Sequence, residues 1–305
     1  MKDLTSRQAD TGAPESEPFV LQCYDGEKLA GYAWRAVPGS APGVSSGGPR
    51  AVLLILHGYA EHAGRHAGLA RAAARAGFDV WSFDQRNHGN SPGPVRGSVE
   101  SFTPALADLA ALQMHAREES GRVPNFLFGH SMGGAMALRY ALDHPERLDG
   151  LVLSSPFLLD AAKRPKVVTG AAPILKSLFP SVPTARLSAD AISREPDEIS
   201  RYLADPLIYH GGVRADAGAT MLQEGAELLR LAGALSVDTL VVHGSADQIA
   251  DVEGSRRLAA ASPRVRYVEQ EGGFHELHHD APDSGVPQAT RAAVVDWLEE
   301  RLAGS

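Results

Sequence analysis

Cysteine is almost absent from this sequence, which has one, Cys23, in 305 residues. A single cysteine forms no disulfide within the chain and builds no thiolate metal site, which favours a reducing compartment. Aromatic residues are also scarce, at 6%. No run approaches the roughly 20 apolar residues of a membrane-spanning helix, and the polar start of the chain lacks the apolar stretch of a secretory signal. We therefore expect a cytoplasmic protein.

The sequence also has no excess of positively charged residues. The formal net charge of −8 repels nucleic acid and anionic lipid at long range, so we expect no nucleic-acid partner. The hydrophobic fraction of 44% and charged fraction of 22% are typical of a globular protein with a sizeable core, and they exclude wholesale disorder. The length predicts one large α/β domain with an insertion.

Apolar runs alternate with helical patterns along most of the chain. Residues 51–56, AVLLIL, are typical of a strand buried on both faces of a mostly parallel sheet. After an antiparallel hairpin at 19–35, we expect further strands at 78–83, 125–128, 151–153, 239–242 and 265–269, and helices at 66–76, 104–117, 132–142, 252–261 and 289–302. Strand–helix–strand units imply right-handed crossovers, so the pattern predicts a doubly wound α/β sheet with helices on both faces.

The alternation stops between residues 157 and 235. This stretch has several prolines, no convincing strand, helical apolar spacing at 174–179 and 221–231, and nine acidic and nine basic residues. It therefore predicts a neutral helical insertion. The chain is then expected to divide into a loose leader at 1–16, a core in two parts at 17–156 and 236–305, and the insertion at 157–235.

The motif Gly129-His130-Ser131-Met132-Gly133 lies between a predicted strand and a predicted helix. A serine at such a turn has a strained backbone that small neighbours permit, and its hydroxyl projects from the edge of the sheet. The alternative is a glycine-rich turn capped by serine. The order of strand, turn and helix favours a nucleophile, and we predict that role for Ser131.

A nucleophilic serine needs a base, and at such sites the acid and then the base follow later strands. Asp247 follows the strand expected at 239–242, and His275 follows the one expected at 265–269. The strand ends meet at one edge of a parallel sheet. We predict that His275 takes the serine proton and that Asp247 fixes its tautomer.

Other residues are candidates for the acid and for the base that assist Ser131. Asp251 is a second candidate acid, but we interpret it as the N-cap of the helix that follows. His278 and His279 lie close to His275, and we expect both to be exposed. With these interpretations, Asp247 and His275 remain the preferred acid and base.

Acyl transfer also needs two backbone N–H groups directed at the developing oxyanion. Met132, directly after the nucleophile, offers one, and Tyr59, in the loop after the strand at 51–56, offers the other. Glu61, His62 and His66 follow in that loop. The sequence lacks H-E-x-x-H, so we expect no metal and interpret these residues as hydrogen-bonding groups that stiffen the loop.

Several of these motifs belong together. They are HGYAEH at 57–62, DQRNHGNS at 84–91, GHSMG at 129–133, and Asp247 and His275-Glu276. Jointly they resemble the monoacylglycerol lipase and lysophospholipase branch of the α/β-hydrolases, over about residues 19–302 including DPL at 205–207. The branch usually has glycine at Asn87, and asparagine tolerates positive φ better than most residues.

The resemblance implies an α/β-hydrolase fold with a helical cap at 157–235 over an acyl-binding pocket. It also implies the triad Ser131, Asp247 and His275, and the oxyanion donors Tyr59 and Met132. We predict a serine hydrolase that cleaves carboxylic esters of amphiphilic molecules, such as monoacylglycerols, through an acyl-enzyme on Ser131 and without a cofactor. Nothing in the neutral cap marks an anionic head group.

Apolar residues of the cap are expected to line an acyl channel, namely Leu175, Leu178 and Phe179. At most transient membrane contact is expected, through the cap. Two alternatives remain open: a general carboxylesterase or thioesterase with the same triad, and a binding protein that keeps the hydrolase scaffold without turnover. Peptidases and haloperoxidases also use this fold.

Overall fold

A computed structural model describes residues 15–39, 48–162, 166–278 and 286–304. They form an eight-stranded sheet with the order β1-β2-β4-β3-β5-β6-β9-β10. The strands are β1 (Glu17–Gln22), β2 (Lys28–Trp34), β3 (Ala51–Leu56), β4 (Phe78–Phe83), β5 (Asn125–His130), β6 (Gly150–Ser154), β9 (Thr239–Gly244) and β10 (Val265–Gln270). β2 pairs antiparallel with β1 and β4, and the other pairs are parallel. The predicted doubly wound sheet is confirmed.

The central strands bury both of their faces. Along β3, Val52, Leu54 and Leu56 pack into one core, while Leu53 and Ile55 pack into a second core on the opposite side of the sheet. Alternate residues of a strand point to opposite faces, so an uninterrupted aliphatic run needs cover on both. The sequence therefore dictates helices above and below the sheet.

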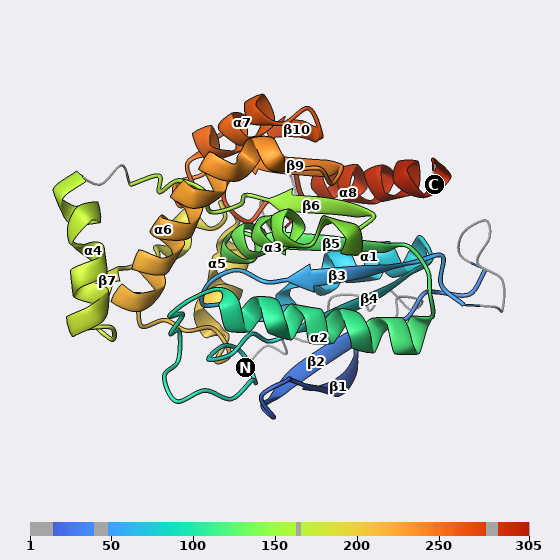
Figure 1. Cartoon of the computed structure of the whole chain (residues 1–305), viewed down its shortest axis with the longest axis horizontal. Coiled ribbons are helices and arrows are strands. Elements are labelled where there is room, and N and C mark those ends of the chain that lie inside the picture. The colour runs from blue at the N-terminus through green and yellow to red at the C-terminus, as the bar shows by residue number, and fades with distance from the viewer. Residues whose placement is uncertain (1–14, 40–47, 163–165, 279–285, 305) are drawn as a thin grey trace.

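Five helices supply that cover (Figure 1). The first core includes residues of α2 (Thr103–Ser120), α3 (Met132–Asp143) and α7 (Val252–Ala261), and the second includes residues of α1 (Ala67–Arg75) and α8 (Val286–Ala303). All five coincide with predicted helical patterns to within one turn. Among the described residues, no helix combines the length and the apolar composition that crossing a bilayer requires.

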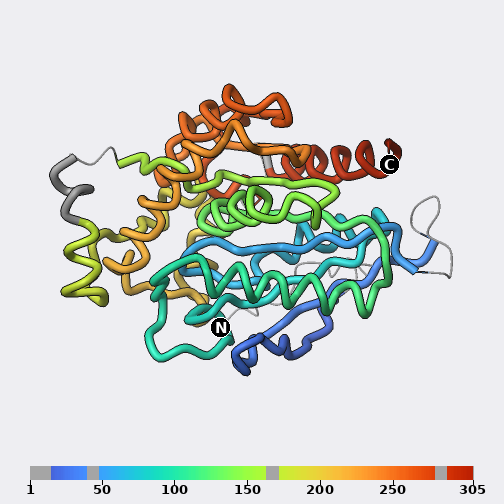
Figure 2. Tube along the Cα trace, viewed as in Figure 1, coloured from blue at the N-terminus to red at the C-terminus, as the bar shows by residue number. Residues whose placement is uncertain are grey.

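The chain leaves the sheet after β6 and returns to it at β9, as the trace in Figure 2 shows. The excursion contains α4 (Lys166–Leu178), β7 (Pro183–Ala185), α5 (Pro196–Ala204), β8 (Val213–Arg214) and α6 (Ala215–Leu231). α6 packs against both α4 and α3. The expectation of no strand here was wrong, because β7 and β8 pair antiparallel. Strands of two or three residues are too short to show an alternating pattern.

Candidate active site

Ser131 occupies the turn between β5 and α3 with φ 53° and ψ −117°, so the predicted backbone strain is confirmed. The glycines around it are required by close packing. A Cβ on Gly129 would lie 2.4 Å from the Gly133 carbonyl oxygen, and one on Gly133 would lie 2.4 Å from the carbonyl oxygen of Leu56. Side chains at either position would force the strand and helix apart and move the serine.

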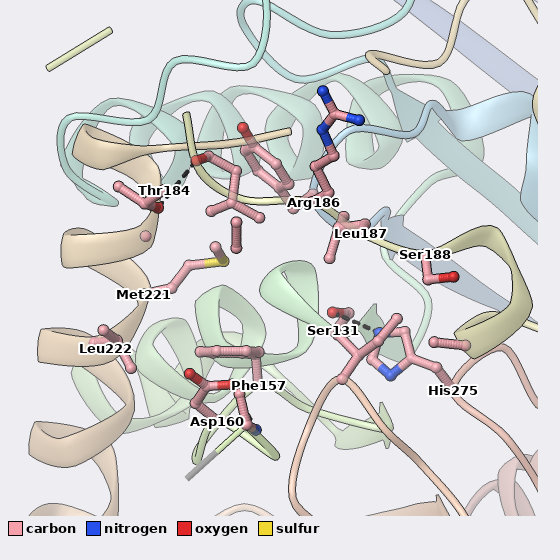
Figure 3. A pocket seen from close by; sticks show the side chains of 18 of the residues that line it. Ser131, Phe157, Asp160, Thr184, Arg186, Leu187, Ser188, Met221, Leu222 and His275 are labelled. Atoms are coloured by element: carbon pink, nitrogen blue, oxygen red, sulfur yellow. Dashed lines mark hydrogen bonds between the residues drawn. The ribbon is translucent and has the colours of Figure 1, made fainter. Parts of the chain in front are cut away.

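Three loops at the same edge of the sheet bring the predicted triad residues together. Ser131 follows β5, Asp247 follows β9 and His275 follows β10. The Ser131 Oγ lies 2.9 Å from His275 Nε2, and His275 Nδ1 lies 2.7 Å from Asp247 Oδ2. The serine hydroxyl can thus donate to the imidazole, whose other nitrogen donates to the carboxylate. Ser131 and His275 face the cavity described below (Figure 3).

The Asp247 carboxylate is buried and has four donors. Its Oδ1 accepts from the N–H groups of Ile249, at 2.8 Å, and Ala250, at 3.1 Å, while Oδ2 accepts from His275 and from His243 Nε2, at 3.1 Å. Burial raises its pKa, but the charge of His275 and the imidazole donors outweigh burial and hold that pKa well below its usual range. These four donors therefore favour the ionised form of Asp247.

His243, the last residue but one of β9, was assigned no role from the sequence. Its Nδ1 lies 2.7 Å from Ser255 Oγ and accepts that hydroxyl proton, which leaves Nε2 to donate to Asp247. The His243 and Asp247 side chains are both fully buried. The sequence shows that His243 and Asp247 are four residues apart. Whether their side chains form a hydrogen bond depends on the geometry of the loop between them, which the sequence does not show.

The rival residues have other partners. Asp251 Oδ1 accepts from the Glu253 N–H at 3.0 Å and caps α7, as predicted. The expectation that His278 is exposed was wrong: it is buried and stacks on His66 with ring centroids 4.8 Å apart. The chain turns inward there because Leu277 joins the second core. His279 lies outside the described residues.

The loop after β3 carries the predicted oxyanion donor Tyr59. The backbone N–H groups of Tyr59 and Met132 make no hydrogen bond with any described residue. Glu61 Oε1 accepts the Gly58 N–H at 2.6 Å, which agrees with a stiffening role for Glu61. The Tyr59 hydroxyl donates to the Gly97 carbonyl at 2.9 Å and ties the loop to another segment.

Asn87 has φ 66°, the conformation expected of an asparagine at a glycine position. The surrounding loop is held by Asp84, whose carboxylate accepts the N–H groups of Ala63, at 2.8 Å, and Asn90, at 2.7 Å. The Asp84 hydrogen bond to Ala63 links this loop to the turn that follows the oxyanion loop. None of these residues lines the cavity.

A cavity of about 780 Å³ lies above Ser131. Its larger part is apolar, with Phe157, Met221 and Leu222 facing the space (Figure 3) and Leu175 of α4 in the wall. The expectation that Leu178 and Phe179 line it was wrong. The last turn of α4 extends past the cavity, which leaves Leu178 65% exposed and Phe179 57% exposed on the outer surface.

Part of the cavity lining beside the oxyanion loop and the base loop is polar, a feature that the sequence did not predict. Glu61 and Glu276 contribute to it, and Arg65 lies between them, 3.2 Å from Glu61 Oε2 and 2.7 Å from Glu276 Oε2. Arg65 also lies 3.6 Å from Glu198 of α5 and over the ring of Tyr202. Arg65 thus pairs with one carboxylate from each of three segments and joins the oxyanion loop, the base loop and the cap.

The sheet order, the strained serine between strand and helix and the insertion above it define an α/β-hydrolase. The model of the S33 serine aminopeptidase family matches residues 47–282. A monoacylglycerol lipase of Mycolicibacterium smegmatis is 34% identical, over 82% of this chain and 90% of its own. A monoglyceride lipase of Rattus norvegicus is 32% identical, over 85% of each chain.

A solved structure agrees with these relatives. The crystal structure of Paleococcus ferrophilus monoacylglycerol lipase is 29% identical, with a TM-score of 0.77 over 90% of this chain and 99% of that chain. The chain belongs to the S33 serine aminopeptidase family of α/β-hydrolases. The resemblance drawn from the motifs is confirmed, and with it the expected class, a carboxylic ester hydrolase similar to the monoacylglycerol lipases.

Proposed function

We propose that this protein hydrolyses monoacylglycerols and that Ser131 is its nucleophile, with His275 as base and Asp247 as the acid that orients it. The observation that carries the proposal is the cavity above Ser131, whose lining combines apolar side chains with the buried carboxylates of Glu61 and Glu276. The apolar side chains suit one acyl chain, and the carboxylates suit the hydroxyls of a glycerol. The names of the relatives support the same substrate.

In the first half of the reaction, His275 accepts the Ser131 proton as the oxygen attacks the ester carbonyl. The N–H groups of Tyr59 and Met132 stabilise the negative oxygen of the tetrahedral intermediate. Burial lowers the pKa of His275, but the Asp247 carboxylate outweighs burial and raises it, which stabilises the imidazolium formed at this step. The imidazolium then protonates the departing glycerol oxygen.

In the second half, water replaces the alcohol. His275 removes a proton from the water, the hydroxide attacks the acyl carbon, and the acid leaves as Ser131 regains its proton. The carboxylates of Glu61 and Glu276 accept hydrogen bonds from the glycerol hydroxyls. Every step uses side chains and backbone N–H groups of this chain together with water.

The alternative of a general carboxylesterase or thioesterase shares this chemistry and differs in the acyl group. Peptidase activity, which the family's description mentions, would need the same triad with an amine as leaving group. The volume and apolar wall of the cavity favour a long acyl chain over a small ester. Dependence of rate on acyl chain length therefore separates these functions.

We expect kcat/KM for p-nitrophenyl esters to rise several-fold for every two added carbons, from butyrate to dodecanoate, because each buried methylene contributes about 0.8 kcal/mol. Leu175→Asp places a charge in the wall of the cavity and should remove this preference while butyrate hydrolysis continues. Leu178→Asp is the matched control on the same helix. It should leave the profile unchanged for esters below their micelle concentration.

Equal efficiency across the series in the wild-type protein would leave a general esterase as the better description. If Leu178→Asp changed the profile as much as Leu175→Asp, the acyl chain would follow the outer surface of α4 instead of the cavity. Thermal unfolding of both variants, measured in parallel, shows whether a lost preference reflects a lost fold.

We further propose that the cap makes transient contact with membranes. Four exposed apolar residues gather around the end of α4: Ile174, Leu178, Phe179 and Val182. α4 lies at the outer margin of the molecule, away from the sheet (Figure 1). Such exposed groups mark interaction sites, and a bilayer that supplies monoacylglycerol fits them. The cytoplasmic location expected from the sequence stays a prediction.

The double variant Leu178→Ser and Phe179→Ser should bind neutral phosphatidylcholine vesicles about tenfold more weakly in a sedimentation assay, because two apolar side chains no longer enter the bilayer. Hydrolysis of monomeric esters should not change. Val20→Ser with Tyr24→Ser removes two exposed apolar residues near β1 and is the control. Equal loss of binding in the control would contradict docking through the cap.

A further inference from the structure

The Tyr59 side chain reaches from the oxyanion loop to the cap. It is buried, and its hydroxyl contacts backbone groups of two other segments. The hydroxyl donates to the Gly97 carbonyl at 2.9 Å and accepts the Arg214 N–H of the cap at 3.2 Å. The Gly212 carbonyl oxygen lies 3.2 Å away on the same cap segment. Burial raises the pKa of this hydroxyl, so it keeps its proton and can donate and accept at once.

The peptide that carries the proposed oxyanion donor is held from the core. It joins the Gly58 carbonyl to the Tyr59 N–H in one plane, so a group that fixes the carbonyl also directs the N–H. The Gly58 carbonyl oxygen lies 2.8 Å from His57 Nδ1. The Gln85 N–H donates to His57 Nε2 at 2.9 Å, so Nδ1 carries the proton and donates to Gly58. Burial lowers the pKa of His57 to about 3, which keeps the ring neutral.

The other side of Tyr59 is held by the cap. Ala60, the next residue, has φ 67°, and its carbonyl accepts the Tyr209 N–H at 2.8 Å. Positive φ is strained for a residue with a Cβ, so this turn persists because its surroundings hold it. The cap therefore holds Tyr59 twice, at the hydroxyl through Arg214 and at the following peptide through Tyr209.

The cap segment that binds the hydroxyl is fixed in its turn. β8, which contains Arg214, pairs with β7, and the Ala215 N–H donates to the Val182 carbonyl at 2.9 Å. α6 follows β8 directly and packs against α3. α3 begins at Met132, the other proposed oxyanion donor. Both donors therefore lie on segments that contact β8 or α6 of the cap.

We propose that the Tyr59 hydroxyl is a positioning group for the reaction: by anchoring the oxyanion loop to the cap, it keeps the Tyr59 N–H directed at the place where the negative oxygen develops. The inference rests on the proposed function. A donor stabilises the tetrahedral intermediate only over a narrow range of positions, so a ring that is free at its far end lets the donor move. The cap then acts on the chemical step itself, in addition to binding the acyl chain.

Tyr59→Phe tests this role, because it keeps the ring and the peptide and removes only the hydroxyl. Complete loss of one oxyanion donor costs about 10²–10³-fold in turnover. Here the donor is displaced and not lost, since His57 still holds the Gly58 carbonyl. We therefore expect kcat to fall about tenfold and KM to change less than about twofold. The loss should be equal for p-nitrophenyl acetate and octanoate, because the hydroxyl acts on the oxyanion and not on the acyl chain.

Tyr140→Phe is the matched control. Tyr140 of α3 is also buried, and its hydroxyl donates to Gln113 Oε1 at 2.8 Å, away from the cavity. Each variant loses one buried, hydrogen-bonded hydroxyl, so both should lose stability in thermal unfolding. Only Tyr59→Phe should lose kcat. An unchanged kcat in Tyr59→Phe, a loss confined to KM, or equal losses of kcat in both variants would overturn the proposal.

An analogue of the tetrahedral intermediate, 1,1,1-trifluoroacetone, gives a readout that a merely structural role would not change. The Ser131 oxygen adds to its carbonyl carbon, the hydroxyl proton passes to His275, and the ketone oxygen becomes negative at the place of the oxyanion. Its inhibition constant should rise about tenfold in Tyr59→Phe, in step with the fall in kcat/KM. Unchanged inhibition would show that the hydroxyl does not act through the oxyanion donor.

Hydrogen exchange tests the link to the cap in the wild-type protein, so it does not depend on the folding of a variant. Trifluoroacetone is small compared with a cavity of about 780 Å³, and its adduct stays beside Ser131. The adduct should slow amide exchange at residues 209–214, because an oxyanion that fixes the Tyr59 N–H also fixes the cap segment bonded to this residue. Tyr59→Phe should show less of this protection. A wild-type adduct without it would mean that the cap and the oxyanion loop are not coupled.

Failure of this inference is distinct from failure of the proposed function. If the wild-type protein hydrolyses 1-oleoylglycerol and Tyr59→Phe has the same kcat, the proposed function stands and the hydroxyl has no positioning role. A wild-type protein inactive on 1-oleoylglycerol contradicts the proposed function itself, whatever the variant does.

Discussion

Ser131→Ala lowers ester hydrolysis about 10⁴-fold or more while the fold is retained, because the proposed reaction has no route that bypasses the acyl-enzyme. Alanine keeps the Cβ and loses only the hydroxyl, so the strained turn and its close glycine contacts are unchanged. The residual rate should equal that of the oxyanion donors and binding alone. Steady-state hydrolysis of p-nitrophenyl butyrate and circular dichroism measure the two parts of this expectation.

Ser131→Gly is the matched control for the turn. Glycine also lacks the hydroxyl, and it adopts positive φ without the steric cost that a Cβ brings. The glycine variant should therefore be as inactive as the alanine variant but more stable, by about 1 kcal/mol in the free energy of unfolding. Chemical denaturation compares the two variants directly.

Substantial activity in either folded variant would show that Ser131 is not the nucleophile. A fluorophosphonate probe gives an independent readout, because it should label the wild-type protein and neither variant. Labelling that persists in Ser131→Ala would place the reactive serine elsewhere in the chain.

Much of the fold was predictable because its strands are local apolar runs. The composition of residues 51–56 is enough to predict a strand that is buried on both faces. β3 has those bounds. The triad residues could be brought together in advance because parallel strands place the loops after them at one edge. Ser131, Asp247 and His275 each follow such a strand, so their convergence needs only the order of the strands, without any knowledge of side-chain positions.

The sequence did not predict those features of the site that depend on contacts between segments far apart in the chain. Arg65 and Glu276 are separated by 211 positions, and no local pattern relates them. His278 is buried because Leu277 beside it enters the core, which the polar surroundings of the motif conceal. Leu175 and Leu178 are alike in sequence, and the place where α4 passes the cavity decides which one lines it.

Asp247→Asn is expected to lower turnover by about 10³–10⁴-fold through the tautomer of His275. The asparagine oxygen can still accept the N–H groups of Ile249 and Ala250, which turns its NH₂ group toward His275 and His243. An NH₂ group donates, so His275 Nδ1 must become the acceptor and Nε2 takes the proton. An imidazole protonated at Nε2 cannot accept the Ser131 hydroxyl proton, and the nucleophile is no longer activated.

The pH profile separates this mechanism from general damage. In the wild-type protein the Asp247 charge raises the pKa of His275, and activity falls as the pH drops through that raised pKa because the base becomes protonated. Without the charge the pKa of His275 is lower, so the acid limb of the residual activity should move to lower pH. Damage to the fold would reduce activity at every pH and leave the limb where it was.

Asp251→Asn is the control for the rival acid. Asparagine caps helices about as well as aspartate, and the Asp251 carboxylate caps α7 without contacting His275, so this variant should retain nearly full turnover and an unchanged acid limb. Loss of activity in Asp251→Asn with a functional Asp247→Asn would reverse the two roles. If both variants stayed active, His275 would be oriented by another group, and the carboxylate 2.7 Å from its Nδ1 would serve the fold alone.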